Sequence, residues 1–105
     1  MNIDELKEKL RKYRKEDIII TPHAEFQAFV REVKLEEVRN NIINPDKLVF
    51  IEKQEAKNPW EKKYNCYFAY SKYLSHRYII VLNRKIIIPT IIVINRDWQK
   101  EIEKK

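Results

Sequence analysis

The spacing of apolar residues changes once along the chain, at Asn44-Pro45, and this change constrains the fold more than any other feature. Before it, apolar residues recur at steps of three and four, which is the spacing of amphipathic helices. After it, they alternate or form β-branched runs such as "RYIIVLN" and "TIIVIN", which are typical of strands. The sequence therefore predicts the α+β class, with two to three N-terminal helices packed on a roughly four-stranded antiparallel sheet.

Local signals place the helix starts. Asn2 with Glu5 fits a capping box in front of a helix over residues 3–15. Thr21 followed by Pro22 is typical of an N-cap and a first helical position. The stretch "IIIT" between these two helices is interpreted as a short apolar link, and "KLEEVRNNII" continues the helical pattern.

We expect one domain over residues 1–105, with an added N-terminal helix in 1–17, a helical segment in 18–45 and the antiparallel sheet in 46–98. Pro89 interrupts the last apolar run. Proline donates no backbone hydrogen bond, so the last strand starts at Pro89, bulges there or lies at a sheet edge.

The chain contains no Gly, and this excludes several classes of site. Phosphate-cradling loops, dinucleotide fingerprints and nucleophile elbows need Gly where the backbone turns sharply or approaches a ligand. Without Gly, we expect Asn to occupy the positions with a left-handed backbone conformation. The asparagines expected at turns and caps are Asn44, Asn58, Asn83 and Asn95.

Cysteine usage and hydropathy set the expected compartment. A single cysteine, Cys66, forms no internal disulfide, is too little for a cysteine-based zinc site, and alternates with core aromatics. There is no uncharged apolar run long enough for a membrane span. We expect a cytoplasmic protein without a membrane partner, a metal or a cofactor.

The excess of positive over negative charge lies in the strand-rich half. Residues 1–61 carry 12 Lys or Arg and 13 Asp or Glu, whereas residues 62–100 carry eight Lys or Arg and one Asp. Tyrosines are interleaved with these bases, a combination that single-stranded nucleic acid favours because cations neutralise phosphates and rings stack on bases. A solubilising basic surface, or one that binds an acidic protein, is the alternative.

Arg77 and Arg96 are the strongest candidates for binding a phosphate, since each stands at the end of an apolar strand run and arginine offers a fixed fork of donors. Tyr73 and Trp98 are their nearest aromatic neighbours in sequence. The remaining candidates for nucleic-acid contact are basic: Lys63, Lys72, Arg84 and Lys85.

Two histidines are present, His23 and His76. Cleavage of RNA by its own 2′-hydroxyl needs a base, an acid and cations around the phosphorane, and two imidazoles suit the first two roles. The two lie on different predicted elements. The alternative for His23 is an ordinary first-turn residue of a helix.

The stretch "TPHAEFQAFVREVKLEEVRNNIINP", followed by strands, resembles a family of small domains of unknown function grouped with the RelE/ParE/BrnT-like toxin fold. Their motif is a Thr/Ser-x-His-Ala-x-x-Arg helix, then R-x-[IV]-x-x-E-E-V, then Asn-Pro. Gln27 stands where that motif has Arg. The resemblance covers roughly residues 20–97, and its matched positions are Thr21, His23, Ala24, Arg31, Val33, Glu36, Glu37, Val38, Asn44 and Pro45.

The resemblance implies helices followed by a curved antiparallel sheet, and a metal-independent endoribonuclease that cuts mRNA, often on the ribosome, and is held by an antitoxin protein. Under this hypothesis Arg77 and Arg96 contact the scissile phosphate, Tyr73 positions the nucleotide and His23 is the acid or base. The alternative is a non-catalytic module that binds nucleic acid or protein on the same fold, which Gln27 favours. The N-terminal helix is either a docking or homodimer element or the closure of its own core.

Overall fold

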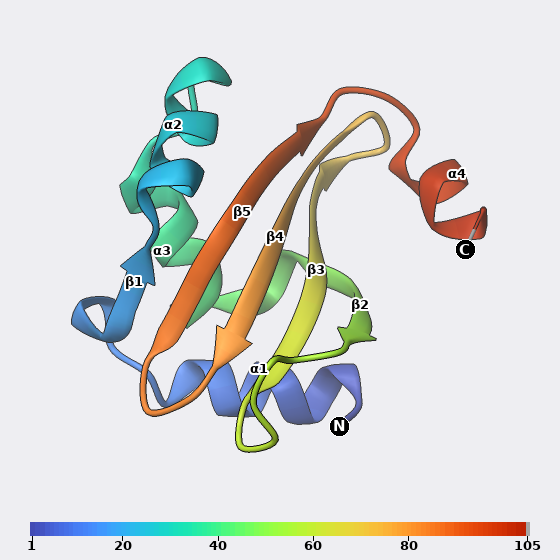
Figure 1. Cartoon of the computed structure of the whole chain (residues 1–105). Helices are drawn as coiled ribbons and strands as arrows, with labels where there is room; N and C mark the ends of the chain where they lie inside the picture. The colour runs from blue at the N-terminus through green and yellow to red at the C-terminus, as the bar shows by residue number, and fades with distance from the viewer. Residues whose placement is uncertain (105) are drawn as a thin grey trace.

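The computed structural model describes residues 1–104 and confirms the α+β class (Figure 1). A five-stranded sheet is combined with helices that are mostly N-terminal. The elements in chain order are α1 (Ile3–Arg11), the 3-10 turn η1 (Lys15–Asp17), β1 (Ile18–Ile20), α2 (Pro22–Val30), α3 (Leu35–Ile43), the 3-10 turn η2 (Pro45–Lys47), β2 (Leu48–Gln54), β3 (Lys62–Ser71), β4 (Leu74–Leu82), β5 (Ile86–Ile94) and α4 (Trp98–Glu103).

The sheet has the order β1-β5-β4-β3-β2, in which β1 runs parallel to β5 and all other neighbours are antiparallel. The strand that the sequence did not predict is β1, the segment interpreted there as a link. It has only three residues, too few to show a period, and its pairing partner Ile86–Ile88 lies far along the sequence. Figure 1 shows β1 at the edge of the sheet beside β5.

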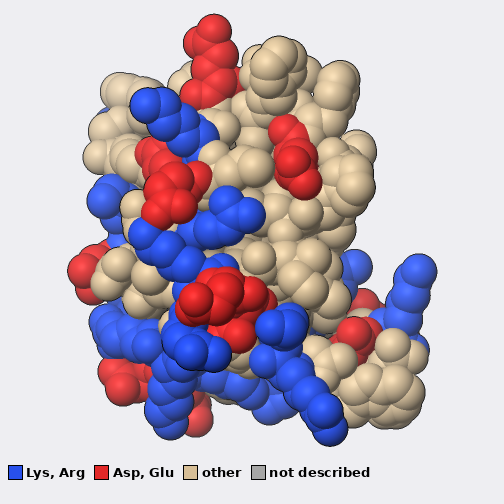
Figure 2. All heavy atoms as spheres, turned by 90° about the vertical axis from the view of Figure 1, so that its left-hand side faces the viewer, with Lys and Arg blue, Asp and Glu red and all other residues tan. Residues whose placement is uncertain are grey.

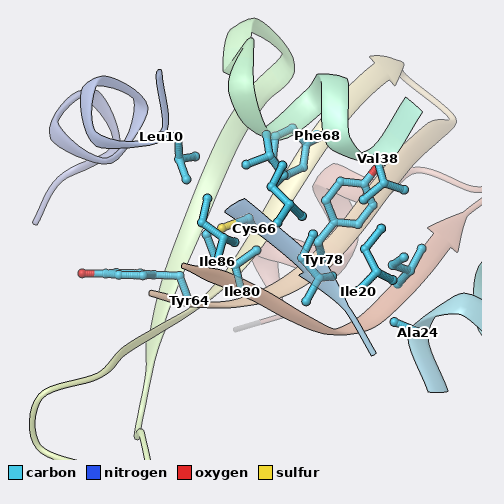
Figure 3. Packing of buried hydrophobic residues seen from close by; sticks show 14 of the residues in the cluster. Leu10, Ile20, Ala24, Val38, Tyr64, Cys66, Phe68, Tyr78, Ile80 and Ile86 are labelled. Atoms are coloured by element: carbon cyan, nitrogen blue, oxygen red, sulfur yellow. The ribbon is translucent and has the colours of Figure 1, made fainter. Parts of the chain in front are cut away.

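The N-terminal helices cover one face of the sheet. In Figure 1, α1 and α3 lie behind the strands, and α2 lies along the far part of β5. Figure 3 shows Leu10 and Val38 of these helices approaching Phe68, Tyr78 and Ile80 of the central strands. The buried residues of this core are Leu6, Leu10, Ile18, Ile20, Ala24, Ala28, Val38, Ile42, Leu48, Tyr64, Cys66, Phe68, Tyr78, Ile80, Leu82, Ile86, Ile88 and Ile91.

The predicted helix starts are confirmed. Asn2 Oδ1 accepts from the Glu5 amide at 2.9 Å, and Glu5 Oε1 accepts from the Asn2 amide at 3.1 Å, which completes the capping box. Thr21 Oγ1 accepts from the Ala24 amide at 3.2 Å, and Pro22 is the first helical residue. The first helix ends at Arg11, earlier than predicted, because the chain turns into η1.

Of the three alternatives for Pro89, the bulge is confirmed. The β4–β5 register shifts between Ile79 and Val81, and Pro89 lies inside β5 opposite that shift. The start of α2 is fixed to the same place: the Thr21 amide donates to the Ile88 carbonyl at 3.1 Å, and Gln27 Oε1 accepts from the Ile91 amide at 2.8 Å. Gln27, the departure from the family motif, is thus a structural link between α2 and β5.

The expectation that asparagine takes the left-handed positions is wrong. Within residues 1–104 the one residue with positive φ is Glu32, at 58°. It follows the C-cap Arg31 of α2, and the Val33 amide donates back to the Ala28 carbonyl at 2.8 Å, as in a Schellman motif. Glycine is preferred at this position because a Cβ atom is crowded there.

Replacing Glu32 with Gly is expected to stabilise the protein by about 0.5–1 kcal/mol, or roughly 2–8 °C in Tm, by removing this crowding. Thermal unfolding followed by circular dichroism measures the change. Glu32→Ala is the control, because it removes the charge and keeps Cβ. Equal Tm gains in both variants would assign the effect to charge and contradict the backbone explanation.

Candidate nucleic-acid interface on the open face of the sheet

The face of the sheet that α1 and α3 leave uncovered, here called the open face, can be read from the strand register. Residues directly opposite on neighbouring strands point to the same side. Four rows cross the open face, and they are Ala69–Ser75–Ile94, then Phe50–Tyr67–Arg77–Ile92, then Glu52–Asn65–Ile79–Thr90, and last Gln54–Lys63–Val81–Ile87.

The short helix α4 covers the first row. Trp98 is only 9% exposed and packs with Tyr67 and Ile94, while Ile102 adds to this second apolar cluster. The indole N–H of Trp98 donates to the Ser71 carbonyl at 2.6 Å. The C-terminal segment is therefore attached to the sheet by one buried aromatic.

The opposite end of the open face is hollowed. A cleft of about 460 Å³ lies between the β2–β3 loop, residues 55–61, and the ends of β3, β4 and β5. Lys63 and Val81 of the fourth row line it. The open face is thus bounded by α4 at one end and by a loop with a cleft at the other.

On this face and next to α4, buried hydrogen-bonding groups are left without partners. Four buried side-chain polar atoms in residues 1–104 have no hydrogen-bond partner, namely Asn65 Oδ1, Ser75 Oγ, Arg77 Nε and Asp97 Oδ1. Three belong to the open-face rows, and the fourth directly precedes α4. Leaving such an atom unpaired costs about 1–3 kcal/mol, so the cluster calls for an explanation.

Arg77 occupies the middle of this face. It is half-buried, opposite Tyr67 on one side and Ile92 on the other. In the next row, the Asn65 amide donates to Glu52 Oε1 at 3.3 Å. A guanidinium, a carboxamide and a carboxylate therefore lie within two adjacent rows of a surface that is otherwise largely apolar.

Two other predicted phosphate-site residues lie at the α4 end of the open face. Tyr73 is 60% exposed in the β3–β4 turn, and Arg96 follows β5 at the same end because Ser75 pairs with Ile94. Arg96 is 68% exposed and its Nε lies 2.9 Å from Glu101 Oε1. The structure therefore places Tyr73 and Arg96 at one end of the sheet and Arg77 one row inward.

The other predicted bases do not form one patch. Lys72 lies in the β3–β4 turn, with its Nζ 5.4 Å from the Tyr73 ring centroid. Lys63 lines the cleft, while Arg84 and Lys85 lie in the β4–β5 turn at the opposite end from Lys72. Lys85 also pairs with Asp17 at 3.5 Å. The basic residues of the sheet are therefore divided between its two ends.

The interpretation of the interleaved tyrosines as a stacking surface is wrong for most of them. Tyr64, Tyr67 and Tyr78 are at most 2% exposed. Trp98 is likewise enclosed, so its ring is not free to stack on a base. An aromatic that sequence reasoning missed is Trp60, 68% exposed in the β2–β3 loop. Its signal in the sequence is a lone tryptophan in the polar stretch "NPWEKK".

The exposed side of β1 and α2 differs from the open face. Viewed from that side, basic and acidic residues intermingle over the lower part, and fewer charged residues are separated by uncharged surface in the upper part (Figure 2). Phe26, Phe29 and Val30 of α2 are more than half exposed. His23 is also exposed on this helix, one turn before Gln27 and on the same side of it.

The two histidines are not brought together. His76 lies on the helix-covered face of β4, is 5% exposed and belongs to a closed polar network. Its Nδ1 lies 2.7 Å from the Tyr78 hydroxyl. Asn41 Nδ2 donates to Tyr78 at 2.9 Å and to Tyr70 at 2.8 Å, and Tyr70 donates to Glu37 Oε2 at 2.6 Å.

This network fixes the state of His76. Because the Tyr78 hydroxyl accepts from Asn41, its proton is directed to Nδ1, which leaves a neutral ring with the proton on Nε2. Burial lowers the pKa of His76, and the Glu37 carboxylate opposes this in part. Burial and the hydrogen bond to Glu37 raise the pKa of Tyr70 to about 12, so its hydroxyl stays a donor.

The lowered pKa of His76 predicts a pH-dependent stability. Below the ordinary pKa of histidine, the unfolded chain binds a proton that the folded chain does not bind. The free energy of unfolding therefore falls as the pH decreases from about 7 to about 5. The slope is at most about 1.4 kcal/mol per pH unit. Urea unfolding across this range measures the slope. His76→Gln is expected to flatten it and the matched control His23→Ala to keep it, whereas equal slopes in all three proteins would contradict this origin.

Comparison with protein-family models, with curated proteins and with solved structures finds no match to this chain. In the part of the chain that the structure describes, no three His, Cys, Asp or Glu side chains are grouped so as to hold a metal ion. Nor does any helix within residues 1–104 combine the length and the apolar character needed to cross a membrane.

Proposed function

We propose that this chain is a RelE-like, toxin-type protein that binds single-stranded RNA on the open face of its sheet and cleaves it without a metal ion. The observation that carries the proposal is Arg77. Its half-buried guanidinium stands in the middle of an uncovered sheet face, and its Nε has no hydrogen-bond partner.

A phosphate is the ligand that best satisfies such a group. The guanidinium presents parallel N–H donors that match two oxygens of a phosphate. Partial burial strengthens that contact, because water competes less for the donors.

The remaining candidates extend the same surface. Arg96, Tyr73 and Lys72 lie at the α4 end, and Lys63 lies at the cleft end. The rows containing Ser75 and Val81 are six residues apart along β4, which is about 20 Å. A single RNA strand that crosses Arg77 can therefore reach the basic residues at both ends of the sheet. The division of positive charge between the two ends supports an extended ligand.

For cleavage, the open face offers a carboxylate in place of an imidazole. Glu52 lies one row from Arg77 and is positioned by Asn65. We assign to Glu52 the removal of the 2′-hydroxyl proton and to Arg77 the charge of the phosphorane. The 2′-oxygen forms a bond to phosphorus, the bond from phosphorus to the 5′-oxygen breaks, and the 5′-oxygen takes a proton from solvent. His23 lies on α2, outside the four rows, and is not assigned a role in this division.

A second candidate is RNA binding without cleavage. It is favoured by two observations: His76 is enclosed on the opposite face, and Gln27, in place of the motif arginine, is engaged by the backbone of β5. The experiments that follow separate binding from cleavage.

Arg77→Met, which keeps the apolar stem and removes the guanidinium, is expected to weaken binding of a fluorescein-labelled 12-nucleotide RNA by about 10- to 100-fold. The slope of log affinity against log salt should fall by about 0.7, the value of one phosphate contact on a single strand. Fluorescence anisotropy over a salt series measures both. Arg31→Met, the same change at an exposed position at the end of α2 and outside the four rows, is the matched control.

Absence of RNA binding by the wild-type protein at low salt, or equal losses in the two variants, would overturn the proposal. Incubation of the RNA with EDTA present then tests cleavage. Under the first candidate the wild-type protein cuts and Glu52→Gln binds without cutting. An RNA that is bound through Arg77 and stays intact identifies the second candidate.

A further inference from the structure

The cleft at the end of the open face has the dimensions of a small-molecule site. Its volume of about 460 Å³ falls within the range of about 300–1,000 Å³ typical of such sites. It lies between the β2–β3 loop and the last row of the sheet. Measured along β4, Val81 in the cleft is four residues from Arg77, or about 13 Å, so the cleft and the phosphate site are separate places on one surface.

The floor of the cleft is apolar. Val81 and Ile87 project from β4 and β5, Pro89 adds its ring at the bulge, and Ala56 lines the loop side. Small, branched and cyclic side chains of this kind form a broad surface without hydrogen-bonding groups. A flat ring such as a nucleobase is complementary to it, because one face of the ring is removed from water.

The rim of the cleft is charged, with an excess of cations. Lys57 and Lys63 line it, and neither has an ion-pair partner in the described chain. The third charged residue, Glu61, is held by the loop itself: its Oε1 accepts from Asn58 Nδ2 at 3.0 Å, and its amide donates to the Asn58 carbonyl at 3.1 Å. A ligand with an anionic group and a planar apolar body matches this rim and floor.

Trp60 stands next to this rim. It precedes Glu61 in the loop and is 68% exposed. Exposure of an indole is unfavourable, because burying its apolar surface would stabilise the fold. Stacking on a base is worth about 1–3 kcal/mol per ring. Trp60 does not itself line the cleft, but it adjoins the lining residue Glu61 and so gives the loop an exposed ring next to the cleft rim.

We infer that this cleft holds one nucleotide of the bound RNA, with the base between the apolar floor and the β2–β3 loop and the phosphate at Lys57 and Lys63. Glu61 selects the base: a carboxylate only accepts hydrogen bonds, so guanine, with adjacent N–H donors, is preferred over uracil, which flanks its single donor with two carbonyl oxygens. This inference rests on the proposed function for the identity of the polymer, whereas a nucleotide in the cleft can be tested alone.

The probes are 5′-GMP and 5′-UMP, followed by quenching of tryptophan fluorescence. The chain has two tryptophans and Trp98 is buried, so Trp60 is the accessible reporter, and loss of the signal in Trp60→Phe verifies this. We expect saturable quenching, tighter for 5′-GMP than for 5′-UMP by about fivefold or more. Glu61→Gln should reduce that ratio.

Two variants locate the nucleotide. Lys57→Ala combined with Lys63→Ala should lower the affinity for 5′-GMP by about tenfold. Ala56→Leu should lower it by a similar factor, because the larger side chain fills the cleft. Lys53→Ala is the matched control, since Lys53 is an exposed lysine of β2 that pairs with the core residue Tyr64 and so points to the other face. It should leave the affinity unchanged.

Affinities of 5′-GMP that are equal in the wild type, Ala56→Leu and the double lysine variant, or no quenching at all, would overturn the inference. If RNA still binds through Arg77 in that case, the proposed function stands and only the cleft assignment is lost. If mononucleotides bind in the cleft while Arg77→Met leaves RNA binding unchanged, the cleft assignment stands and the proposed function fails.

Discussion

Burial of one face of β3, β4 and β5 by the N-terminal helices is the constraint on which the rest of the structure depends. Along β3, Tyr64, Cys66 and Phe68 point to the helices while Asn65 and Tyr67 point away. Because side chains alternate strictly, a shift of one residue in register would exchange the two sets. The packing of α1 and α3 therefore decides which face stays open, and with it the position of every residue in the four rows.

The two faces of the sheet differ in whether their buried polar side chains have hydrogen-bond partners, and this difference indicates where the candidate site lies. On the covered face, Asn41, Tyr70, Tyr78 and His76 form one connected network, so the polar side chains there are satisfied within the fold. On the open face, buried atoms of Asn65, Ser75 and Arg77 lack partners. Of these three residues only Arg77 is partly exposed, so its guanidinium is the group that an external ligand can reach.

Much of the fold could be predicted from the sequence because its signals are local. The capping box at Asn2, the Thr21-Pro22 start and the change of period at Pro45 each depend on a few neighbouring residues. The strand β1 could not be predicted, since three isoleucines form a strand only through parallel pairing with β5. The same applies to Glu32, whose left-handed backbone follows from how α2 ends against the core.

The candidate site could be predicted from the sequence less well than the fold, because its signals are not local. Net charge and aromatic content identified the strand-rich half, but they carry no information on which face a strand residue occupies. Alternation alone cannot tell the buried Tyr67 from the exposed Tyr73, because the fate of a ring depends on whether a distant segment such as α4 packs on it. Arg77 was identified from its position beside an apolar run. Trp60 and the cleft depend on how the β2–β3 loop folds back, which no short-range pattern encodes.

The bulge at Pro89 has a further effect, on how separate copies of the molecule meet. An isoleucine-rich outer strand is a template for edge-to-edge growth when its amides are unpaired. Here β1 pairs with the first part of β5, proline removes one donor at the point where β1 stops, and Gln27 occupies the amide of Ile91. The part of β5 that β1 does not cover therefore lacks the regular row of free amides that an incoming strand would need.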